Sequence, residues 1–181
     1  MNPADARKIL AEADLICPAS QVDAAVRRVA TEIEARLGDA NPLVLAVMGG
    51  AVVFAGQLLP LLGFPLDFDY LHVTRYGDVT VGGSLRWVVE PRIPVTGRTV
   101  LVIDDILDEG VTMAAIVARL REQGATEVFG AVFAEKDLGH AKPIRADFVG
   151  VTLPNRYVFG FGMDVKGAWR NLPAVYAVQG M

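Results

Sequence analysis

The sequence predicts an α/β protein with a mostly parallel central sheet flanked by helices, and two patterns support this prediction. Continuous apolar runs such as Leu43–Val47 and Val100–Ile103 are typical of strands buried on both faces. Stretches with helical spacing separate these runs, and strands that alternate with helices favour a parallel sheet. A chain of 181 residues is long enough to bury its own core, so we expect a single domain.

The composition and charge exclude several classes of protein. With 52% hydrophobic and 21% charged residues the chain is not disordered, and its apolar runs are too short to cross a bilayer. Its start, MNPADARKILAEAD, lacks the apolar segment of a signal peptide, and the single cysteine, Cys17, forms no internal disulfide. We therefore expect a soluble cytoplasmic protein with no membrane partner. The net charge of -4 gives no electrostatic reason to expect a nucleic acid partner.

The chain before residue 40 is predicted to be helical. A short polar helix covers about Ala4–Asp14, and Cys17–Ala19 interrupts the pattern. Ser20 is the expected N-cap of a second helix, with Asp23 three residues later as in a capping box, and Gly38 ends that helix. Its apolar positions recur at helical spacing: Val22, Val26, Val29, Ile33 and Leu37.

The first buried strand, Leu43–Val47, runs through Met48 into the pair Gly49 and Gly50 and then into a predicted helix over residues 51–62. Glycines between a strand and a helix allow the backbone to approach an anion closely. The pair is therefore a candidate anion-binding turn.

The next strand is expected over Leu66–Arg75. His72 lies inside it, and an isolated histidine of this kind is more typical of a sheet face than of catalysis, so we assign it no role. Glycines and small polar residues at Gly77–Ser84 then predict a mobile hairpin before an extended segment, Leu85–Val89.

The strongest pattern in the chain is strand, acidic loop, helix. The strand at Val100–Ile103 is expected to end at Asp104 and Asp105, and a helix with an apolar face follows from Thr112 until Gly124 stops it. Ligands of open α/β sheets collect at the carboxyl ends of strands, where a helix N-terminus offers amides and a positive dipole.

This geometry predicts a phosphate cradle beside two acids. The acids, Asp104 and Asp105, would hold sugar hydroxyls or a hard cation. The cradle would use the amides of Asp108, Glu109, Gly110, Val111 and Thr112 and the Thr112 hydroxyl. The alternative is that the acids only end a strand and start a helix, but the strand, glycine, threonine and helix agree on a site.

A further strand, Glu127–Ala134, is expected to end in Glu135, Lys136 and Asp137. Lys136 would then lie near the phosphate loop, where it could meet an exocyclic oxygen of a ligand or simply be solvated. The residues alone leave both possibilities open.

The segment VLVIDDILDEGVT, Val100–Thr112, resembles the phosphoribosyl diphosphate motif of the type I phosphoribosyltransferases. The resemblance implies that this motif binds the ribose 5-phosphate and its hydroxyls. It also implies that the turn at Gly49 and Gly50 binds diphosphate. Many purine members have a lysine before the glycine where this chain has Met48, so we expect diphosphate contacts from the backbone here.

The C-terminal part is similar to hypoxanthine-guanine members of the same family. The matching residues, in order and spacing, are Asp147–Gly150, Pro154, Tyr157–Val158, Gly160, Met163–Asp164 and Arg170–Pro173. By this resemblance Tyr157 stacks on the base and the Val158 backbone binds its edge, while Lys136 binds the purine 6-oxo group. Asp164 would bind a second Mg2+, and Arg170 would hold diphosphate. Without it, Asp164 and Arg170 could equally form a surface ion pair.

The resemblance implies purine salvage: transfer of a 5-phosphoribosyl group from phosphoribosyl diphosphate to hypoxanthine or guanine, giving IMP or GMP and diphosphate. Mg2+ would be held by Asp104, Asp105 and Asp164, and Asp108 would accept the proton from purine N7. The core would cover about residues 40–139, with a hood from about 1–38 and 140–181. The assembly would be a homodimer or homotetramer.

The alternative function is a regulator with the same fold that binds nucleotide or RNA without catalysis. Such a protein would be expected to have a basic face or to lose its acids. This chain is acidic overall and retains Asp104, Asp105 and Asp108, which favours the enzyme.

Overall fold

A computed structural model describes residues 1–75 and 85–180 of the chain. The hairpin expected at Gly77–Ser84 lies outside the described residues. The elements, in order, are α1 (Pro3–Glu12), β1 (Asp14–Cys17), α2 (Ala19–Leu37), β2 (Leu43–Met48), α3 (Val52–Leu58), the 3-10 helix η1 (Leu59–Leu61), β3 (Asp67–Arg75), β4 (Leu85–Val89), β5 (Thr99–Leu107), α4 (Val111–Glu122), β6 (Glu127–Asp137), β7 (Phe148–Pro154), β8 (Val158–Phe159) and β9 (Val175–Ala177).

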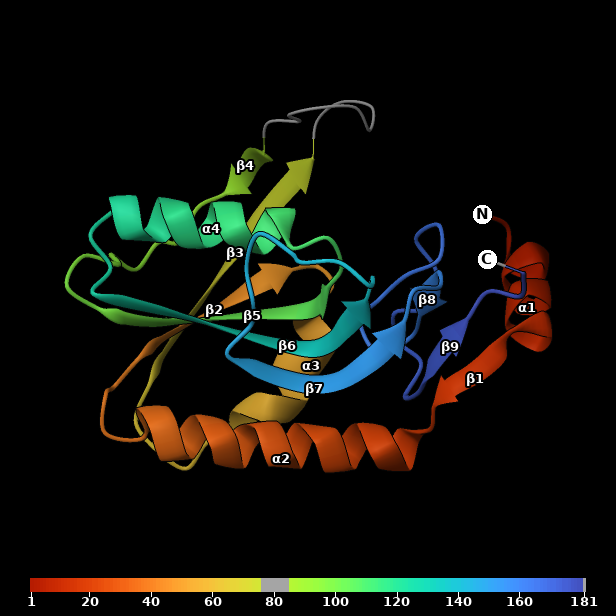
Figure 1. Cartoon of the computed structure of the whole chain (residues 1–181), viewed down its shortest axis with the longest axis horizontal. Helices are drawn as coiled ribbons and strands as arrows, with labels where there is room; N and C mark the ends of the chain where they lie inside the picture. The colour runs from red at the N-terminus through yellow and green to blue at the C-terminus, as the bar shows by residue number, and fades with distance from the viewer. Residues whose placement is uncertain (76–84, 181) are drawn as a thin grey trace.

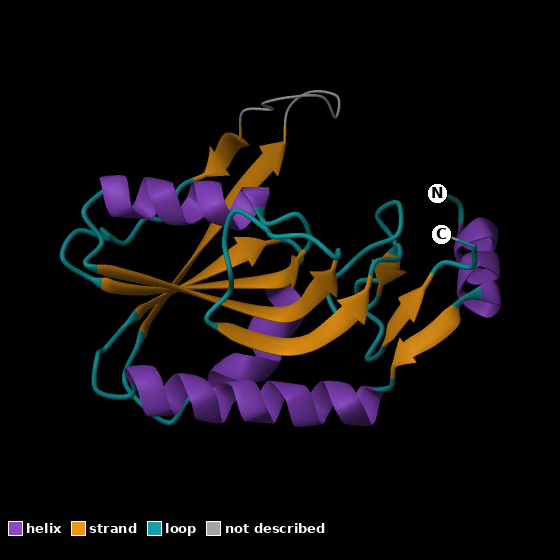
Figure 2. Ribbon diagram, in the orientation of Figure 1, coloured by secondary structure: helices purple, strands orange, loops and turns teal. Residues whose placement is uncertain are grey.

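The main layer is a six-stranded sheet in the order β4-β3-β2-β5-β6-β7. Its strands are parallel except for the pair β3 and β4. Figure 1 shows α4 on one face of this sheet and α2 and α3 on the other, and Figure 2 shows the same layers by type of element. The predicted α/β fold with a mostly parallel sheet is confirmed.

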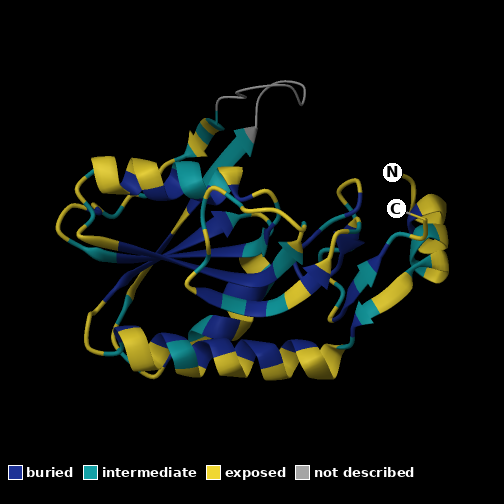
Figure 3. Cartoon of the chain, viewed as in Figure 1, coloured by how far each residue is buried: buried dark blue, intermediate teal, exposed yellow. Residues whose placement is uncertain are grey.

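The apolar core lies on both faces of the sheet. Side chains of α2 and α3 pack against one face, around Phe54 and Phe133, and the apolar residues of α4 pack against the other, around Ile116. Figure 3 shows the central strands buried and the outward faces of α2 and α4 exposed. Because β2 and β5 are buried on both faces, their sequences are almost continuously apolar.

A second, three-stranded sheet has the order β1-β9-β8 and is antiparallel. Figure 1 shows this sheet and α1 beyond the carboxyl ends of β6 and β7. The strand β1 is not predicted from the sequence, because it has little apolar pattern of its own and lies where the predicted first helix meets the interruption at Cys17–Ala19. It forms because Asp14–Cys17 pairs with Val175–Ala177 at the other end of the chain.

Several predicted boundaries are wrong, and so is one predicted cap. The strand β5 does not end at Asp104 but continues to Leu107, because its pairing with β6 continues, and β6 itself runs on to Asp137. The helix α2 begins at Ala19 with Pro18 as its N-cap, so Ser20 lies within the first turn. Asp23 does not cap the helix, since its carboxylate pairs with Arg27 at 2.9 Å.

A buried carboxylate ties β3 to the segment after β4. Asp69 is 2% exposed. It accepts hydrogen bonds from the backbone N–H groups of Tyr70 (2.9 Å), Arg92 (2.6 Å) and Ile93 (3.1 Å). Burial alone raises the pKa of Asp69, but these backbone hydrogen bonds outweigh it and hold the pKa below its ordinary value. The ionised carboxylate therefore stabilises the folded state.

We expect Asp69→Asn to lower the free energy of unfolding by about 1 to 3 kcal/mol at pH 7, because an amide has one acceptor oxygen for three donors. A depressed pKa contributes stability above the ordinary value of about 4 and loses it as pH falls through the lowered value. The difference from the parent should therefore shrink in acid, as measured by denaturant unfolding at several pH values.

The matched control is Asp67→Asn in the same strand, since the Asp67 side chain is 50% exposed and pairs with Arg98 on the surface. Its effect should stay within about 0.5 kcal/mol. Equal losses in the two variants would contradict the role assigned to Asp69.

Candidate active site

The carboxyl ends of β2, β3 and β5 meet at one edge of the sheet, since all three strands are parallel. A cavity of about 570 Å³ lies at this edge. Its lining combines glycines, acids and an arginine from distant parts of the chain: Val47, Met48, Gly49, Gly50, His72, Val73, Asp104, Asp105, Thr112, Asp164 and Arg170. Most of the residues predicted for ribose, diphosphate and metal are therefore brought together.

The two acids, Asp104 and Asp105, lie next to each other in β5, just before the strand ends at Leu107. Asp104 is 9% exposed, and its Oδ1 accepts a hydrogen bond from the Asp105 N–H at 2.9 Å. Burial raises the pKa of Asp104 well above its ordinary value, and the charge of Asp105 raises it further. Burial also raises the pKa of Asp105, although a hydrogen bond with Asp104 and the charge of Arg170 oppose this. The pair therefore favours a bound cation or hydroxyl donor.

Glycine is required at two points around Asp105. A Cβ atom at Gly50 would collide with the Asp105 carboxylate, and one at Gly162 would collide with the Gly50 carbonyl oxygen. Gly162 also has a φ of 99°, which side chains rarely adopt. By contrast, a Cβ at Gly49 would meet no atom within 4 Å. The turn after β2 and the segment after β8 thus approach the acid pair at backbone distance.

Arg170 connects this segment to the acid pair. Its guanidinium donates to the Gly162 carbonyl at 2.6 Å, pairs with Asp164 Oδ1 at 2.5 Å and lies 3.8 Å from Asp105 Oδ2. The other oxygen of Asp164 accepts from the Gly167 N–H at 2.7 Å. The ion pair between Asp164 and Arg170 thus forms at the cavity, and Arg170 is also the residue predicted to hold diphosphate. Both carboxylate oxygens of Asp164 already have partners.

The loop from β5 to α4 forms a second hollow of about 210 Å³, lined by Asp104, Asp105, Ile106, Leu107, Asp108, Gly110, Thr112 and Met113. Gly110 precedes α4 with a left-handed φ of 78°. The N-cap residue Gly110 has no side chain with which to cap this helix. A helix N-terminus presents N–H groups and a positive dipole to an anion, as the sequence predicts for this loop.

Asp108 and Lys136 face each other from the ends of neighbouring strands. Their Oδ2 and Nζ atoms are 3.0 Å apart. The Lys136 side chain is 13% exposed and that of Asp108 is 46% exposed. Lys136 is therefore largely buried beside the phosphate loop rather than solvated.

The two residues predicted for base binding lie in and beside the small sheet. Tyr157 is 43% exposed, and its carbonyl accepts a hydrogen bond from the Val178 N–H at 2.9 Å. Val158 pairs with Ala177 in the β8–β9 ladder. The exposed ring is an apolar surface to which a planar ligand could bind.

Sequence reasoning missed one cavity residue, His72. The strands β2 and β3 are in parallel register, with Met48 opposite His72, so the imidazole lies beside the glycine turn. The position of His72 near the carboxyl end of a predicted strand was the available signal.

No helix among residues 1–75 and 85–180 is long and apolar enough to span a membrane. In the same residues, no group of three or more His, Cys, Asp or Glu side chains is placed to hold a metal ion. Mg2+ commonly binds one or two carboxylates together with substrate oxygens, and the Asp104–Asp105 pair fits that mode.

The match to a family model agrees with this geometry. Residues 18–166 match the phosphoribosyl transferase domain. The chain therefore belongs to the phosphoribosyltransferase family, and the family predicted from its motifs is confirmed.

Two relatives and one solved structure show which members of the family the chain is similar to. The chain is 31% identical to the hypoxanthine-guanine phosphoribosyltransferase of Bacillus subtilis, over 86% of this chain and 87% of that protein. It is 33% identical to the bifunctional protein TilS/HprT of Listeria innocua. That match covers 94% of this chain but only 26% of the Listeria protein. A solved hypoxanthine-guanine-xanthine phosphoribosyltransferase superposes with a TM-score of 0.83 and 29% identity, covering 91% of this chain and 96% of that one.

The glycine turn gives a direct test of the site geometry. Gly50→Ala should lower the free energy of unfolding by about 1 to 3 kcal/mol, because the added methyl group displaces the Asp105 carboxylate. Gly49→Ala is the matched control, since its methyl group enters open space and should change stability by less than about 0.5 kcal/mol. Thermal unfolding of both variants measures the difference, and equal effects would contradict the close approach at Gly50.

Proposed function

We propose that this protein transfers the 5-phosphoribosyl group of phosphoribosyl diphosphate to hypoxanthine or guanine, which gives IMP or GMP and diphosphate. One observation supports this most strongly: a buried acid pair, a helix N-terminus and the Asp108–Lys136 pair meet along one sheet edge. These are the complementary groups for a sugar, a phosphate and a base. Hypoxanthine-guanine relatives of similar length support the same assignment.

In this proposal the acids hold the ribose. Asp104 and Asp105 accept hydrogen bonds from its hydroxyls and oppose the positive charge that develops at the anomeric carbon as purine N9 attacks. The 5-phosphate lies on the amides of Asp108, Glu109, Gly110, Val111 and Thr112. Asp104 and Asp105 would hold Mg2+ together with substrate oxygens, and the ion would supply positive charge beside the departing diphosphate. Burial raises the pKa of both carboxyls, and a cation beside them would favour their ionised forms.

Diphosphate lies in the same cavity. The backbone of Gly49 and Gly50 and the guanidinium of Arg170 supply its ligands, and Asp164 would help to hold a second Mg2+. Arg170 lies within reach of both Asp105 and Asp164, so it can exchange these carboxylates for diphosphate oxygens without a long displacement.

The base lies between the large and small sheets. Lys136 donates to the purine 6-oxo group, Tyr157 stacks on the ring, and the Val158 backbone binds its edge. Asp108 accepts the proton from N7. The 3.0 Å contact between Lys136 and Asp108 supports both roles, because it places a donor and an acceptor side by side.

The proposal extends to location and assembly. The protein acts in the cytoplasm as a homodimer or homotetramer, and the exposed rings of Phe68 and Tyr70 on β3 support an assembly that covers them. The division into a core and a hood stays a prediction, which the small sheet built from both ends of the chain supports.

A spectrophotometric assay with Mg2+, phosphoribosyl diphosphate and each purine tests the function. We expect turnover of hypoxanthine or guanine and negligible turnover of adenine, because Lys136 has no acceptor for a 6-amino group and an unpaired buried group costs about 1 to 3 kcal/mol. Lys136→Ala should narrow the gap between the bases. Efficient use of adenine would refute the assignment, and nucleotide binding without any turnover would favour the non-catalytic regulator.

Asp108→Asn separates proton transfer from local structure. Loss of a general base lowers the rate by about 100-fold to 10,000-fold, whereas a lost polar contact at a helix start lowers stability by about 1 kcal/mol. We expect the variant to melt near the parent and to bind phosphoribosyl diphosphate normally, but to turn over at least about 100-fold more slowly in single-turnover experiments. A rate within a few-fold of the parent would exclude the proton-transfer role.

A further inference from the structure

Lys142 is the least exposed of the lysines for which the structure gives an ion pair. It lies in the connection between β6 and β7, outside every motif that the sequence singled out, and its side chain is only 6% exposed. The ammonium donates to the Leu107 carbonyl at 2.9 Å and to the Lys136 carbonyl at 2.6 Å. It also pairs with Glu135 Oε1 at 3.2 Å. These contacts use all three N–H donors of an ammonium group.

The two carbonyl groups lie at or next to the two residues proposed to bind the base, Asp108 and Lys136. The Leu107 peptide leads directly into Asp108, and the other carbonyl is that of Lys136 itself. Leu107 and Glu135 are the last paired residues of the β5–β6 ladder. The ammonium therefore joins the two strands where their ladder ends, just before the Asp108–Lys136 pair.

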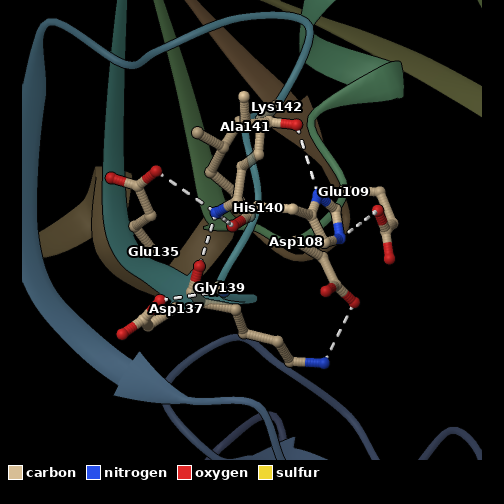
Figure 4. Close-up of polar contacts among 10 residues, drawn as sticks. Asp108, Glu109, Glu135, Asp137, Gly139, His140, Ala141 and Lys142 are labelled. Carbon is tan, nitrogen blue, oxygen red and sulfur yellow. Dashed lines mark hydrogen bonds and ion pairs between the residues drawn. The ribbon is translucent and has the colours of Figure 1, made fainter.

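The connection that carries Lys142 also packs on the phosphate loop. A Cβ atom at Gly110 would lie 3.4 Å from the Lys142 Cβ and 3.4 Å from Pro143 Cδ. Nearby, His140 Nε2 lies 3.9 Å from Glu109 Oε2. Figure 4 shows the connection beside the loop, with Lys142 directed toward Glu135 and His140 toward Glu109.

Stability alone does not account for a lysine at this position. An ammonium with so little exposure loses most of its hydration, and apolar replacements of buried ion pairs are often neutral or stabilising. What an apolar side chain cannot do is bind two carbonyl oxygens and a carboxylate at fixed positions. The geometry of the bound groups is therefore what Lys142 supplies.

We propose that Lys142 is a positioning residue: its ammonium fixes the ends of β5 and β6 so that Asp108 and Lys136 present an acceptor and a donor at the spacing of the purine edge. The inference rests on the proposed function. The three contacts of Lys142 are with the strand ends that carry the base-binding pair, whereas phosphoribosyl diphosphate also has the acid pair of β5 and several further amides as ligands. The loss of Lys142 should therefore weaken purine binding more than the binding of phosphoribosyl diphosphate.

Lys142→Met is the test, since it keeps most of the length of the side chain and removes the donors. We expect the KM for hypoxanthine to rise about 10-fold or more, because a small displacement of a positioned group is enough for a large loss. The KM for phosphoribosyl diphosphate should rise by no more than about threefold, because that substrate keeps its other ligands. The matched control is Arg145→Met, which removes a positive charge from an exposed side chain of the same connection. It should leave both KM values unchanged.

Lys142→Arg keeps the positive charge next to Glu135 and serves if the methionine variant does not fold. A planar guanidinium cannot reproduce the three contacts of an ammonium, so the same split should appear at about threefold or more. Equal changes in both KM values, or no change in either, would overturn the proposal even if the melting temperature falls.

Hydrogen exchange of the unliganded protein gives a readout that is independent of turnover. Lys142→Met should accelerate exchange about 10-fold in the segments around Asp108 and Lys136, while Arg145→Met should not. Unchanged exchange in these segments would overturn the proposal that Lys142 holds the ends of β5 and β6. A parent that turns over none of the 6-oxopurines would refute the proposed function instead, and the exchange experiment would still decide whether Lys142 holds the two strand ends.

Discussion

Two neighbouring carboxylates in a buried strand, the second of them two residues before its end, are the constraint on which the rest of the site depends. Burial raises the pKa of both Asp104 and Asp105, most strongly that of Asp104. An acid whose pKa is raised on folding lowers stability as pH rises from about 4 toward the raised value. The fold therefore holds this pair at a cost in stability, which the cation or ribose hydroxyls of the proposed function would offset.

The backbone around the acids is arranged to leave that space open. Side chains at Gly50 or Gly162 would fill it, so two chain segments approach Asp105 as bare backbone. Arg170 is the cation within reach, yet it stays 3.8 Å from Asp105 and is held more closely by Asp164 and the Gly162 carbonyl. The acids are thus only partly neutralised by the protein itself, which leaves them able to bind a ligand.

The sequence predicts the parts of this site that depend on local pattern. The apolar runs of β2 and β5 identify buried strands. The residues that come next in the sequence, which are the glycine pair after the first run and the two acids and the helix start after the second, predict the site. What depends on pairing between distant segments is not predicted. The strand β1 exists only because Val175–Ala177 lies beside it, and β5 extends beyond Asp104 because β6 continues to pair with it. The contacts of Lys142 likewise join a loop to two strand ends, and no periodicity encodes them.

Under the proposed function, the ion pair between Asp108 and Lys136 would also allow one site to recognise a base by exchange of partners. Without a ligand each group neutralises the other at 3.0 Å, which reduces the cost of burying Lys136. A 6-oxopurine protonated at N7 presents an acceptor next to a donor, so Lys136 and Asp108 can each exchange the other for an atom of the base. Adenine presents its 6-amino donor toward a lysine that can only donate. The selectivity thus follows from the order of donor and acceptor at the strand ends, which any change in the relative positions of β5 and β6 would alter.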